Sequence, residues 1–117
     1  GFRVVGHGKG LRLESRFSGG DVNPYLAFAA IIAAGLDGID RELPLDPEMT
    51  GNAYSSDRPR LPASLYEAIE LWRGSDFARA ALGDEVHAHY LNMAVQEQRQ
   101  FDAAVTDWEL FRSFERS

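Results

Sequence analysis

The sequence predicts an α+β chain in which an N-terminal β-hairpin is followed by a mainly helical region. Two runs that favour strands, 2–5 and 11–17, stand on either side of a glycine-rich segment at 6–10. Glycines permit the positive φ angles of a tight reversal, so this segment predicts the turn of a hairpin. Helix-start signals then recur from residue 23 onward, which predicts several helices after the hairpin.

The first helix is predicted from Pro24 to about Asp40. Asn23 precedes Pro24, which is the pattern of an N-cap followed by proline at the first helical position. The helix is apolar on nearly every side, so we expect it to be buried all round, against a sheet or between other helices. A chain of 117 residues has little material with which to bury it, which indicates missing partners.

Later elements follow from prolines and capping patterns. Residues 42–62 hold four of the five prolines and predict an extended surface loop. Ser64 and Glu67 form a capping-box pattern that opens an amphipathic helix to about Arg73. Further helices are expected over 76–82 (closed by Gly83), over 85–105, and for a turn or two after the capping-box pattern at 106–109. Four aromatic residues are expected in a core or an interface: Trp72, Trp108, Phe111 and Phe114.

Composition excludes several classes of protein. Lys plus Arg is 12 and Asp plus Glu is 18, which gives a net charge of −6. An acidic surface argues against a non-specific nucleic-acid binder. Cysteine is absent, which excludes disulfides and thiolate metal sites and is compatible with a reducing cytoplasm. The longest apolar stretch, 25–36, is too short to span a bilayer. We therefore expect a cytoplasmic protein with neither nucleic-acid nor membrane partners.

Charge gathers unevenly in the hairpin. Residues 1–16 carry Arg3, Lys9, Arg12 and Arg16 against one acid, Glu14, a local sum of 4 − 1 = +3. A cationic island in an acidic chain is what a site for an anionic ligand needs.

Alternation along the second strand places Arg12, Glu14 and Arg16 on one face, while Leu13 and its neighbours occupy the other. Opposite charges nearby favour the ionised form of a carboxylate, and such a carboxylate is a suitable hard ligand for Mg²⁺ or Mn²⁺. The flanking guanidiniums could hold a phosphate or a substrate carboxylate through paired hydrogen bonds. From spacing alone an exposed strand with an ordinary salt-bridge row remains an alternative.

The residues also resemble the C-terminal part of glutamine synthetases. Residues 12–16 resemble the family's Arg-hydrophobic-Glu-x-Arg strand, and 23–30 with 34–39 resemble its most recognisable helix. Residues 61–68 and 108–109 fit its usual ending. The resemblance implies that 1–117 is a C-terminal fragment of a glutamine synthetase catalytic domain. The hairpin (1–17) would come from the catalytic barrel and carry site residues, and 18–117 would be mainly helical.

The resemblance also implies roles for four hairpin residues. Glu14 matches a ligand of the second catalytic metal ion, Mg²⁺ or Mn²⁺. Arg12 matches an arginine that binds ATP phosphate, and Arg3 is the candidate for an upstream arginine that also serves the nucleotide. Arg16 matches the catalytic arginine that contacts the glutamate substrate.

The implied activity is that of an ATP-dependent glutamate–amine ligase, which forms γ-glutamyl amides through a γ-glutamyl phosphate. The acceptor could be ammonia, a polyamine or ethanolamine, and the ending of the chain looks more like the γ-glutamylpolyamine synthetase branch. The full-length parent should form a homo-oligomeric ring. The rest of the family's site lies upstream of Gly1, so we expect the isolated chain to be inactive. The alternative from another class is a non-catalytic helical interaction or oligomerisation module.

The remaining candidates are histidines and a tyrosine. His87 and His89 lie two apart on a predicted helix, so they point in different directions. Glu85 and His89 lie four apart and could touch, but a solvated helix pair is the expectation rather than a metal site. Tyr54 stands near a tyrosine that receives AMP in some bacterial glutamine synthetases, but its surrounding residues depart from that pattern.

Overall fold

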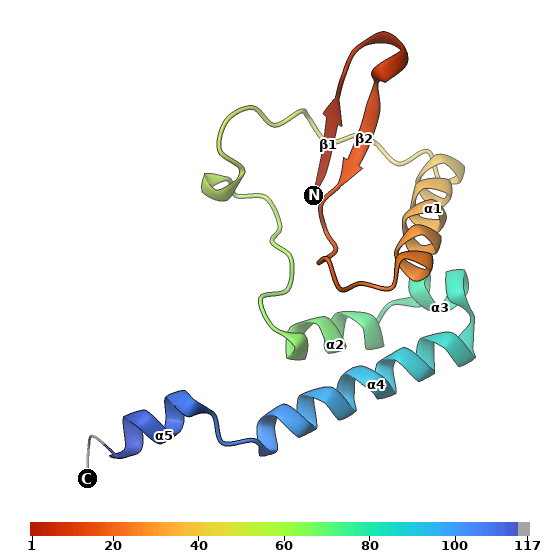
Figure 1. Cartoon of the computed structure of the whole chain (residues 1–117). Helices are drawn as coiled ribbons and strands as arrows, with labels where there is room; N and C mark the ends of the chain where they lie inside the picture. The colour runs from red at the N-terminus through yellow and green to blue at the C-terminus, as the bar shows by residue number, and fades with distance from the viewer. Residues whose placement is uncertain (115–117) are drawn as a thin grey trace. The chain divides into compact units, whose positions relative to one another are not determined.

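The structure, a computed structural model, describes residues 1–114 and confirms a hairpin followed by a mainly helical region (Figure 1). The chain divides into two compact units, the first ending at Leu61 and the second beginning at Pro62. The first unit contains β1 (Phe2–Val5), β2 (Arg12–Ser15) and α1 (Pro24–Asp40). The second contains α2 (Leu65–Arg73), α3 (Asp76–Leu82), α4 (Asp84–Ala103) and α5 (Asp107–Phe114).

The hairpin turn depends on glycine. Gly6 and Gly8 have φ angles of +84° and +54°, values that residues with a side chain rarely adopt. A Cβ atom on Gly6 would collide with the carbonyl oxygen of Gly10. A short 3₁₀ turn, Gly8–Gly10, completes the reversal, and the amide of Leu11 donates to the carbonyl of Gly8 at 3.2 Å. β1 and β2 pair in antiparallel fashion. The second strand is shorter than the predicted 11–17 and starts once this turn has closed.

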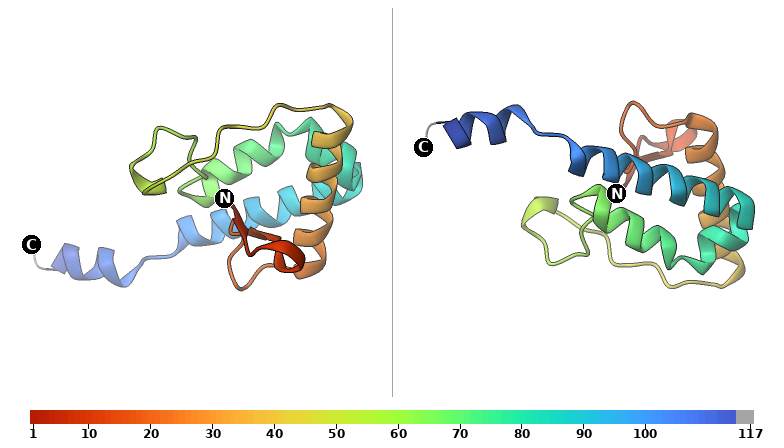
Figure 2. Two further views of the ribbon diagram at one scale, coloured as in Figure 1. Left: turned by 90° about the horizontal axis from the view of Figure 1, so that it is seen from above. Right: turned by 90° about the horizontal axis from the view of Figure 1, so that it is seen from below.

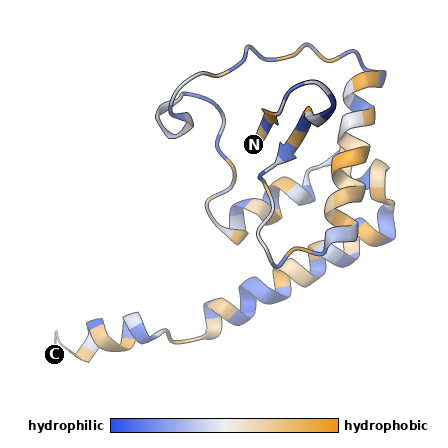
Figure 3. Cartoon of the chain, turned by 45° about the horizontal axis from the view of Figure 1, so that its top comes forward, coloured by the Kyte–Doolittle hydropathy of each residue, from blue (hydrophilic) through white to orange (hydrophobic). Residues whose placement is uncertain are grey.

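Helix α1 has the predicted bounds and the predicted cap. The Asn23 side-chain oxygen accepts from the amides of Tyr25 and Leu26 at 3.0 and 3.3 Å. The expectation of burial all round is wrong for the described part of the chain, in which no α1 residue is buried. One stripe of the helix is half-buried, and apolar residues elsewhere on it remain exposed: Tyr25, Phe28, Ile32, Leu36 and Ile39. Figure 3 shows that much of α1 is hydrophobic.

The loop after α1 is extended, as predicted, apart from a short 3₁₀ turn at Ala53–Ser55. Two arginines hold it in shape. Arg58 pairs with Asp46 at 3.0 Å and donates to the carbonyl of Pro47 at 3.2 Å. Arg60 donates to the carbonyl of Tyr54 at 3.3 Å.

In the second unit, α2 and α3 both pack on α4, and the right-hand view in Figure 2 shows α2 and α4 side by side. Among the described residues of this unit, one buried residue comes from each of these helices: Ile69, Ala78 and His87. Ser64 caps α2 by accepting from the amide of Glu67 at 3.2 Å. Gly83 ends α3 at a φ of +85°, which is why a new helix can start at once.

Trp72 and His87 hold α2 and α4 together. The indole Nε1 of Trp72 donates to the carbonyl of His87 at 3.0 Å, and Nε2 of His87 lies 2.8 Å from the carbonyl oxygen of Trp72. A carbonyl oxygen only accepts, so His87 donates in this bond. The two rings stack, with centroids 5.4 Å apart and planes inclined by 9°. We call this pair the Trp72–His87 clasp.

The last helix begins with a complete capping box. The Thr106 amide donates to Glu109 Oε2 at 2.8 Å, and the Glu109 amide donates to Thr106 Oγ1 at 3.3 Å. The hydrogen bond from the Thr106 backbone, followed by that from its hydroxyl, lowers the pKa of Glu109. Trp108 and Phe111 on this helix are exposed, so within residues 1–114 they belong to no core. None of the helices in the described residues is long and apolar enough to cross a membrane.

Candidate functional site

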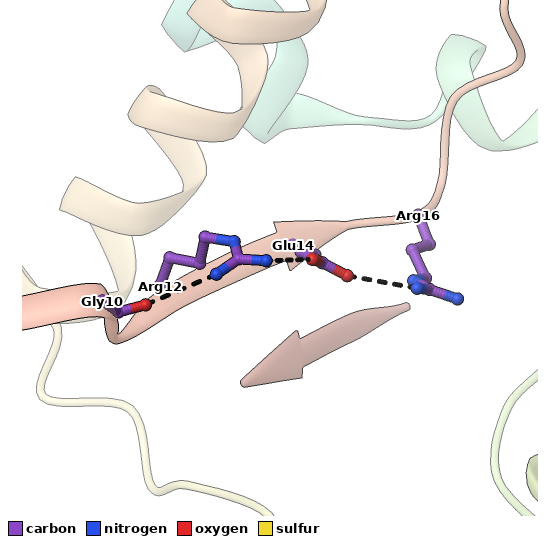
Figure 4. A network of polar contacts seen from close by, with 4 residues as sticks. All are labelled: Gly10, Arg12, Glu14 and Arg16. Carbon is purple, nitrogen blue, oxygen red and sulfur yellow. Dashed lines mark hydrogen bonds and ion pairs between the residues drawn. The ribbon is translucent and has the colours of Figure 1, made fainter. Parts of the chain in front are cut away.

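The candidate site is a row of three charged side chains on β2 and on the residue that follows it. Arg12 Nη2 lies 3.2 Å from Glu14 Oε1, and Arg16 Nη2 lies 3.1 Å from Glu14 Oε2 (Figure 4). Each carboxylate oxygen therefore pairs with a different guanidinium. The prediction from strand alternation that these three residues share a face is confirmed, and we refer to them as the Arg12–Glu14–Arg16 row.

The row is open to solvent, least so at its centre. The Glu14 side chain is 31% exposed, whereas those of Arg12 and Arg16 are 64% and 59% exposed. Ion pairs between exposed side chains typically contribute only about 0–1 kcal/mol to stability. The two pairs can therefore break and reform when a ligand arrives.

Arg3 lies beside the row, on the neighbouring strand. The register places Arg3 directly opposite Glu14, and residues that face each other across an antiparallel pair project to the same side. Arg3 is exposed. This face of the hairpin therefore carries Arg3, Arg12 and Arg16 against Glu14, a sum of 3 − 1 = +2. An excess of positive charge on one face suits an anionic ligand.

One end of the row is connected to the hairpin turn. Arg12 Nη1 lies 3.4 Å from the carbonyl oxygen of Gly10, the residue that closes the turn (Figure 4). The other end of the row is close to the hairpin's open end, where the Arg16 amide donates to the Gly1 carbonyl at 2.9 Å. The two guanidiniums thus belong to opposite ends of the hairpin.

The opposite face of the hairpin is apolar. Phe2 and Phe17 meet edge to face, with ring centroids 4.9 Å apart and planes inclined by 74°. Val4 and Leu13, which are register partners, remain 67% and 69% exposed. The described part of the chain therefore leaves much of this apolar face open.

Glu14 is the candidate metal ligand of the row. Among residues 1–114, no group of three or more His, Asp or Glu side chains is arranged to hold a metal ion. Mg²⁺ is commonly held by one or two carboxylates together with waters and substrate phosphates. Glu14 fits a place in such a shell, in which this chain would supply a single carboxylate.

His87 is a buried residue whose position the sequence pattern did not predict. Only 5% of His87 is exposed, and its ring stacks on Trp72. His89 is exposed, as expected. Tyr54 is 89% exposed, and its amide donates to the Asn52 side chain at 3.0 Å. Neither observation bears on a regulatory role for Tyr54, which stays a hypothesis.

Comparison with known proteins places this hairpin and these helices in a family. The family described as "Glutamine synthetase, catalytic domain" matches residues 1–113 of the chain. This match covers both compact units and includes the Arg12–Glu14–Arg16 row.

Three relatives show the range of amide ligases to which the chain is similar. It is 61% identical, over 97% of its length, to a gamma-glutamylethanolamide synthetase of Streptomyces coelicolor. It is 42% identical over 93% of its length to a glutamate–isopropylamine ligase of a Pseudomonas species, and 41% identical over 90% to a glutamine synthetase of Methanosarcina mazei. The chain spans about a quarter of each relative's length: 25%, 24% and 25%.

Proposed function

The chain belongs to the glutamine synthetase family, and on that premise we propose that it is part of the catalytic domain of a glutamate–amine ligase. The observation that carries the proposal is the Arg12–Glu14–Arg16 row, a carboxylate held between two exposed guanidiniums. The names of the relatives support the reaction class, since they include ligases that join glutamate to ethanolamine or isopropylamine. We further propose that the chain is the C-terminal fragment of that domain and that the parent is a cytoplasmic, ring-shaped homo-oligomer.

The proposed reaction has two steps. The γ-carboxylate of glutamate takes the terminal phosphoryl group of ATP, which gives γ-glutamyl phosphate and ADP. The nitrogen of an amine then attacks the acyl carbon, the bond to phosphate breaks and the nitrogen loses a proton, which gives the γ-glutamyl amide and phosphate. Mg²⁺ or Mn²⁺ would neutralise the charge that develops on the transferred phosphoryl group.

The side chains of the row and of Arg3 would divide this work. Glu14 would ligate the metal ion, and Arg12 and Arg3 would hold ATP phosphates. Arg16 would hold a carboxylate of glutamate. A strand rises about 3.3 Å per residue, so the backbones of Arg12 and Arg16 stand about 13 Å apart. That separation allows a phosphate group at one end of the row and a carboxylate at the other, with Glu14 between them.

The acceptor amine is proposed to carry a substituent, with ethanolamine as the first compound to test. Identity is 61% to the ethanolamide-forming relative and 41% to the glutamine synthetase of M. mazei, over similar shares of this chain. Ammonia and a polyamine are the other two acceptors that the family resemblance implies.

The experiment is a coupled assay on the full-length parent protein with ATP, Mg²⁺, glutamate and one acceptor at a time. The acceptors are ethanolamine, isopropylamine, putrescine and ammonia, and each γ-glutamyl product is identified by mass. We expect phosphate release that requires both glutamate and an amine. Absence of any γ-glutamyl amide with all four acceptors would overturn the proposal. The isolated chain is expected to be inactive, because it supplies only one carboxylate of the metal site.

A second candidate is a non-catalytic interaction module. It is favoured by the apolar residues that α1 leaves in solvent, among them Phe28 at 63% and Ile32 at 62% exposed. The same assay separates the two candidates, because a module would give no amide in any context. Sedimentation of the isolated chain adds a second criterion, since an independent module should be a compact, cooperatively folded species.

A further inference from the structure

The guanidinium of Arg12 is held at both of its terminal nitrogens. Nη2 pairs with Glu14 Oε1 at 3.2 Å, and Nη1 lies 3.4 Å from the carbonyl oxygen of Gly10 (Figure 4). Two contacts on one planar group orient its plane as well as its position. Among the described residues Arg16 has one side-chain contact of this kind, with Glu14 Oε2. Arg12 is therefore the better oriented of the two arginines.

The two contacts of Arg12 differ in kind. The Glu14 carboxylate is proposed to ligate a metal ion, so Arg12 has to share it. The Gly10 carbonyl belongs to the backbone and has no proposed ligand of its own, so it stays available to Arg12 while substrates bind. The Arg12 side chain is 64% exposed, and an exposed arginine loses rotamer freedom when it binds an anion. A contact that orients the side chain beforehand reduces that loss.

The position of the Gly10 carbonyl depends on a glycine across the turn. A Cβ atom on Gly6 would collide with both the carbon and the oxygen of this carbonyl. Gly6 also has a φ of +84°, a value that residues with a side chain rarely adopt. The Gly10 amide donates to the His7 carbonyl at 3.0 Å, which closes the turn around this close approach. A side chain at position 6 would therefore shift the turn, and with it the carbonyl that Arg12 contacts.

We propose that Gly6 is a positioning residue for Arg12: by leaving room for the Gly10 carbonyl, it lets the turn orient the Arg12 guanidinium for a phosphate group. The inference rests on the proposed function, because it takes Arg12 as a ligand of ATP phosphate. Gly6 acts only through Gly10 and Arg12, and not by contact with a substrate. Arg16 lies at the other end of the row and does not depend on the turn.

The test uses the full-length parent and calorimetry with two probes. The first is the Mg²⁺ complex of the β,γ-imido analogue of ATP, which is not hydrolysed, and the second is glutamate added in the presence of that analogue. One variant is Gly6→Ala. Another carries an extra glycine between Gly8 and Lys9, which moves the turn without a collision, at an exposed loop tip where insertions are tolerated. The control is Gly51→Ala, because Gly51 has a φ of +97° but a Cβ atom there would meet nothing within 4 Å.

The two turn variants should lose affinity for one probe only. Each should bind the ATP analogue about fivefold more weakly than the wild type, the effect expected when one long side chain has to be ordered on binding. Their affinity for glutamate should be unchanged, because Arg16 is held from the strand and not from the turn. Gly51→Ala should change neither affinity. If Gly6→Ala does not fold, as circular dichroism would show, the insertion variant alone decides.

A double-mutant cycle separates positioning from a general effect on the structure. In the Arg12→Gln background, Gly6→Ala and the insertion should weaken binding of the analogue no further, because the side chain that the turn orients is gone. A second loss of about the same size in that background would mean that the turn acts on the site by another route, and the positioning role would be overturned.

The positioning role and the proposed function fail in different ways. If the wild type makes γ-glutamyl amides and both turn variants bind the analogue as tightly as it does, the positioning role is overturned and the proposed function stands. If the wild type does not bind the analogue, the assignment of Arg12 to ATP phosphate falls, and the positioning role of Gly6 falls with it.

Discussion

The two compact units of this chain differ in how many side chains they bury. Among the side chains that the structure describes, the first unit has none that is buried, while the second buries Ile69, Ala78 and His87. The residues proposed to carry chemistry all lie in the first unit. The helical unit α2–α4 holds itself together, whereas the hairpin presents charged groups on a scaffold that its own chain packs only lightly.

The two polar networks show the same contrast at the level of single bonds. The Trp72–His87 clasp is buried at His87, both of its hydrogen bonds go to backbone carbonyls, and its rings stack. The Arg12–Glu14–Arg16 row is ionic and exposed, and it joins side chain to side chain. Water and ligands do not compete for the hydrogen-bond partners of a buried network, which therefore holds a structure in place. The groups of an exposed network exchange partners with solvent and ligands.

The largest expected effect is on activity and comes from the hairpin. Glu14→Gln keeps the shape but removes the charge that a hard cation needs, so the full-length parent should lose about 100-fold or more in turnover at limiting Mg²⁺. Its free energy of unfolding should change by less than about 0.5 kcal/mol, as for other exposed ion pairs. Steady-state assays across a Mg²⁺ series and urea unfolding measure the two quantities.

The control for this variant is Glu70→Gln, which removes another exposed carboxylate from an arginine, Arg73, at 3.3 Å. It should leave turnover unchanged. Near-normal turnover of Glu14→Gln at limiting Mg²⁺ would show that Glu14 is not a metal ligand.

The second effect is on stability and comes from the clasp. His87→Ala removes a buried ring, leaves the Trp72 carbonyl without its donor and opens a void between α2 and α4. Together these losses should destabilise the helical unit by about 2–4 kcal/mol. Denaturant unfolding followed by circular dichroism gives the value. The exposed neighbour supplies the control, since His89→Ala should cost less than about 0.5 kcal/mol. Equal values for the two variants would mean that the clasp does not stabilise the unit.

The third prediction concerns what the first unit lacks. Each large apolar side chain of α1 left in water forgoes roughly 1.5–3 kcal/mol of burial, against a typical domain stability of about 5–15 kcal/mol. We expect the isolated chain to be poorly folded or to self-associate through α1. Sedimentation and circular dichroism at matched concentrations test this, and replacing Phe28 and Ile32 with glutamine should reduce association. A compact monomer whose melting does not depend on concentration would contradict the prediction.

Local signals made the helices of both units predictable. Asn23 and Thr106 cap their helices with the bonds that their sequence patterns imply, because a cap needs only residues within a few positions of each other. Alternation along one strand likewise predicted that Arg12, Glu14 and Arg16 share a face.

Features that depend on residues far apart in the sequence were harder to predict. The burial of His87 requires Trp72, which lies on another helix, and no local pattern marks that pairing. The position of Arg3 opposite Glu14 depends on the register that the glycine turn sets. The apolar character of α1 predicted burial, but burial is a property of what surrounds a helix, and residues 1–114 do not surround it.

The smallest expected effect is a pH dependence at α5, where a single carboxylate closes a capping box. Hydrogen bonds from the Thr106 amide and then its hydroxyl lower the pKa of Glu109 below its ordinary value of 4.5. A carboxyl group whose pKa is lower in the folded state stabilises that state above its unfolded pKa, and this contribution disappears as the pH falls through the folded pKa. The start of α5 should therefore loosen below about pH 4.5 and stay constant above it.

The Thr106 amide reports this change directly, because it donates to Glu109 Oε2 at 2.8 Å. Its proton chemical shift, followed by NMR from pH 7 down to pH 2, should move upfield as the carboxylate is protonated and the bond weakens. Glu109→Gln keeps an acceptor oxygen at the same place without a titrating charge, so its Thr106 shift should be flat over the same range. A shift in the wild type that titrates at or above the ordinary value of 4.5 would mean that the capping box does not hold Glu109 as the anion, and α5 would then start without this contribution.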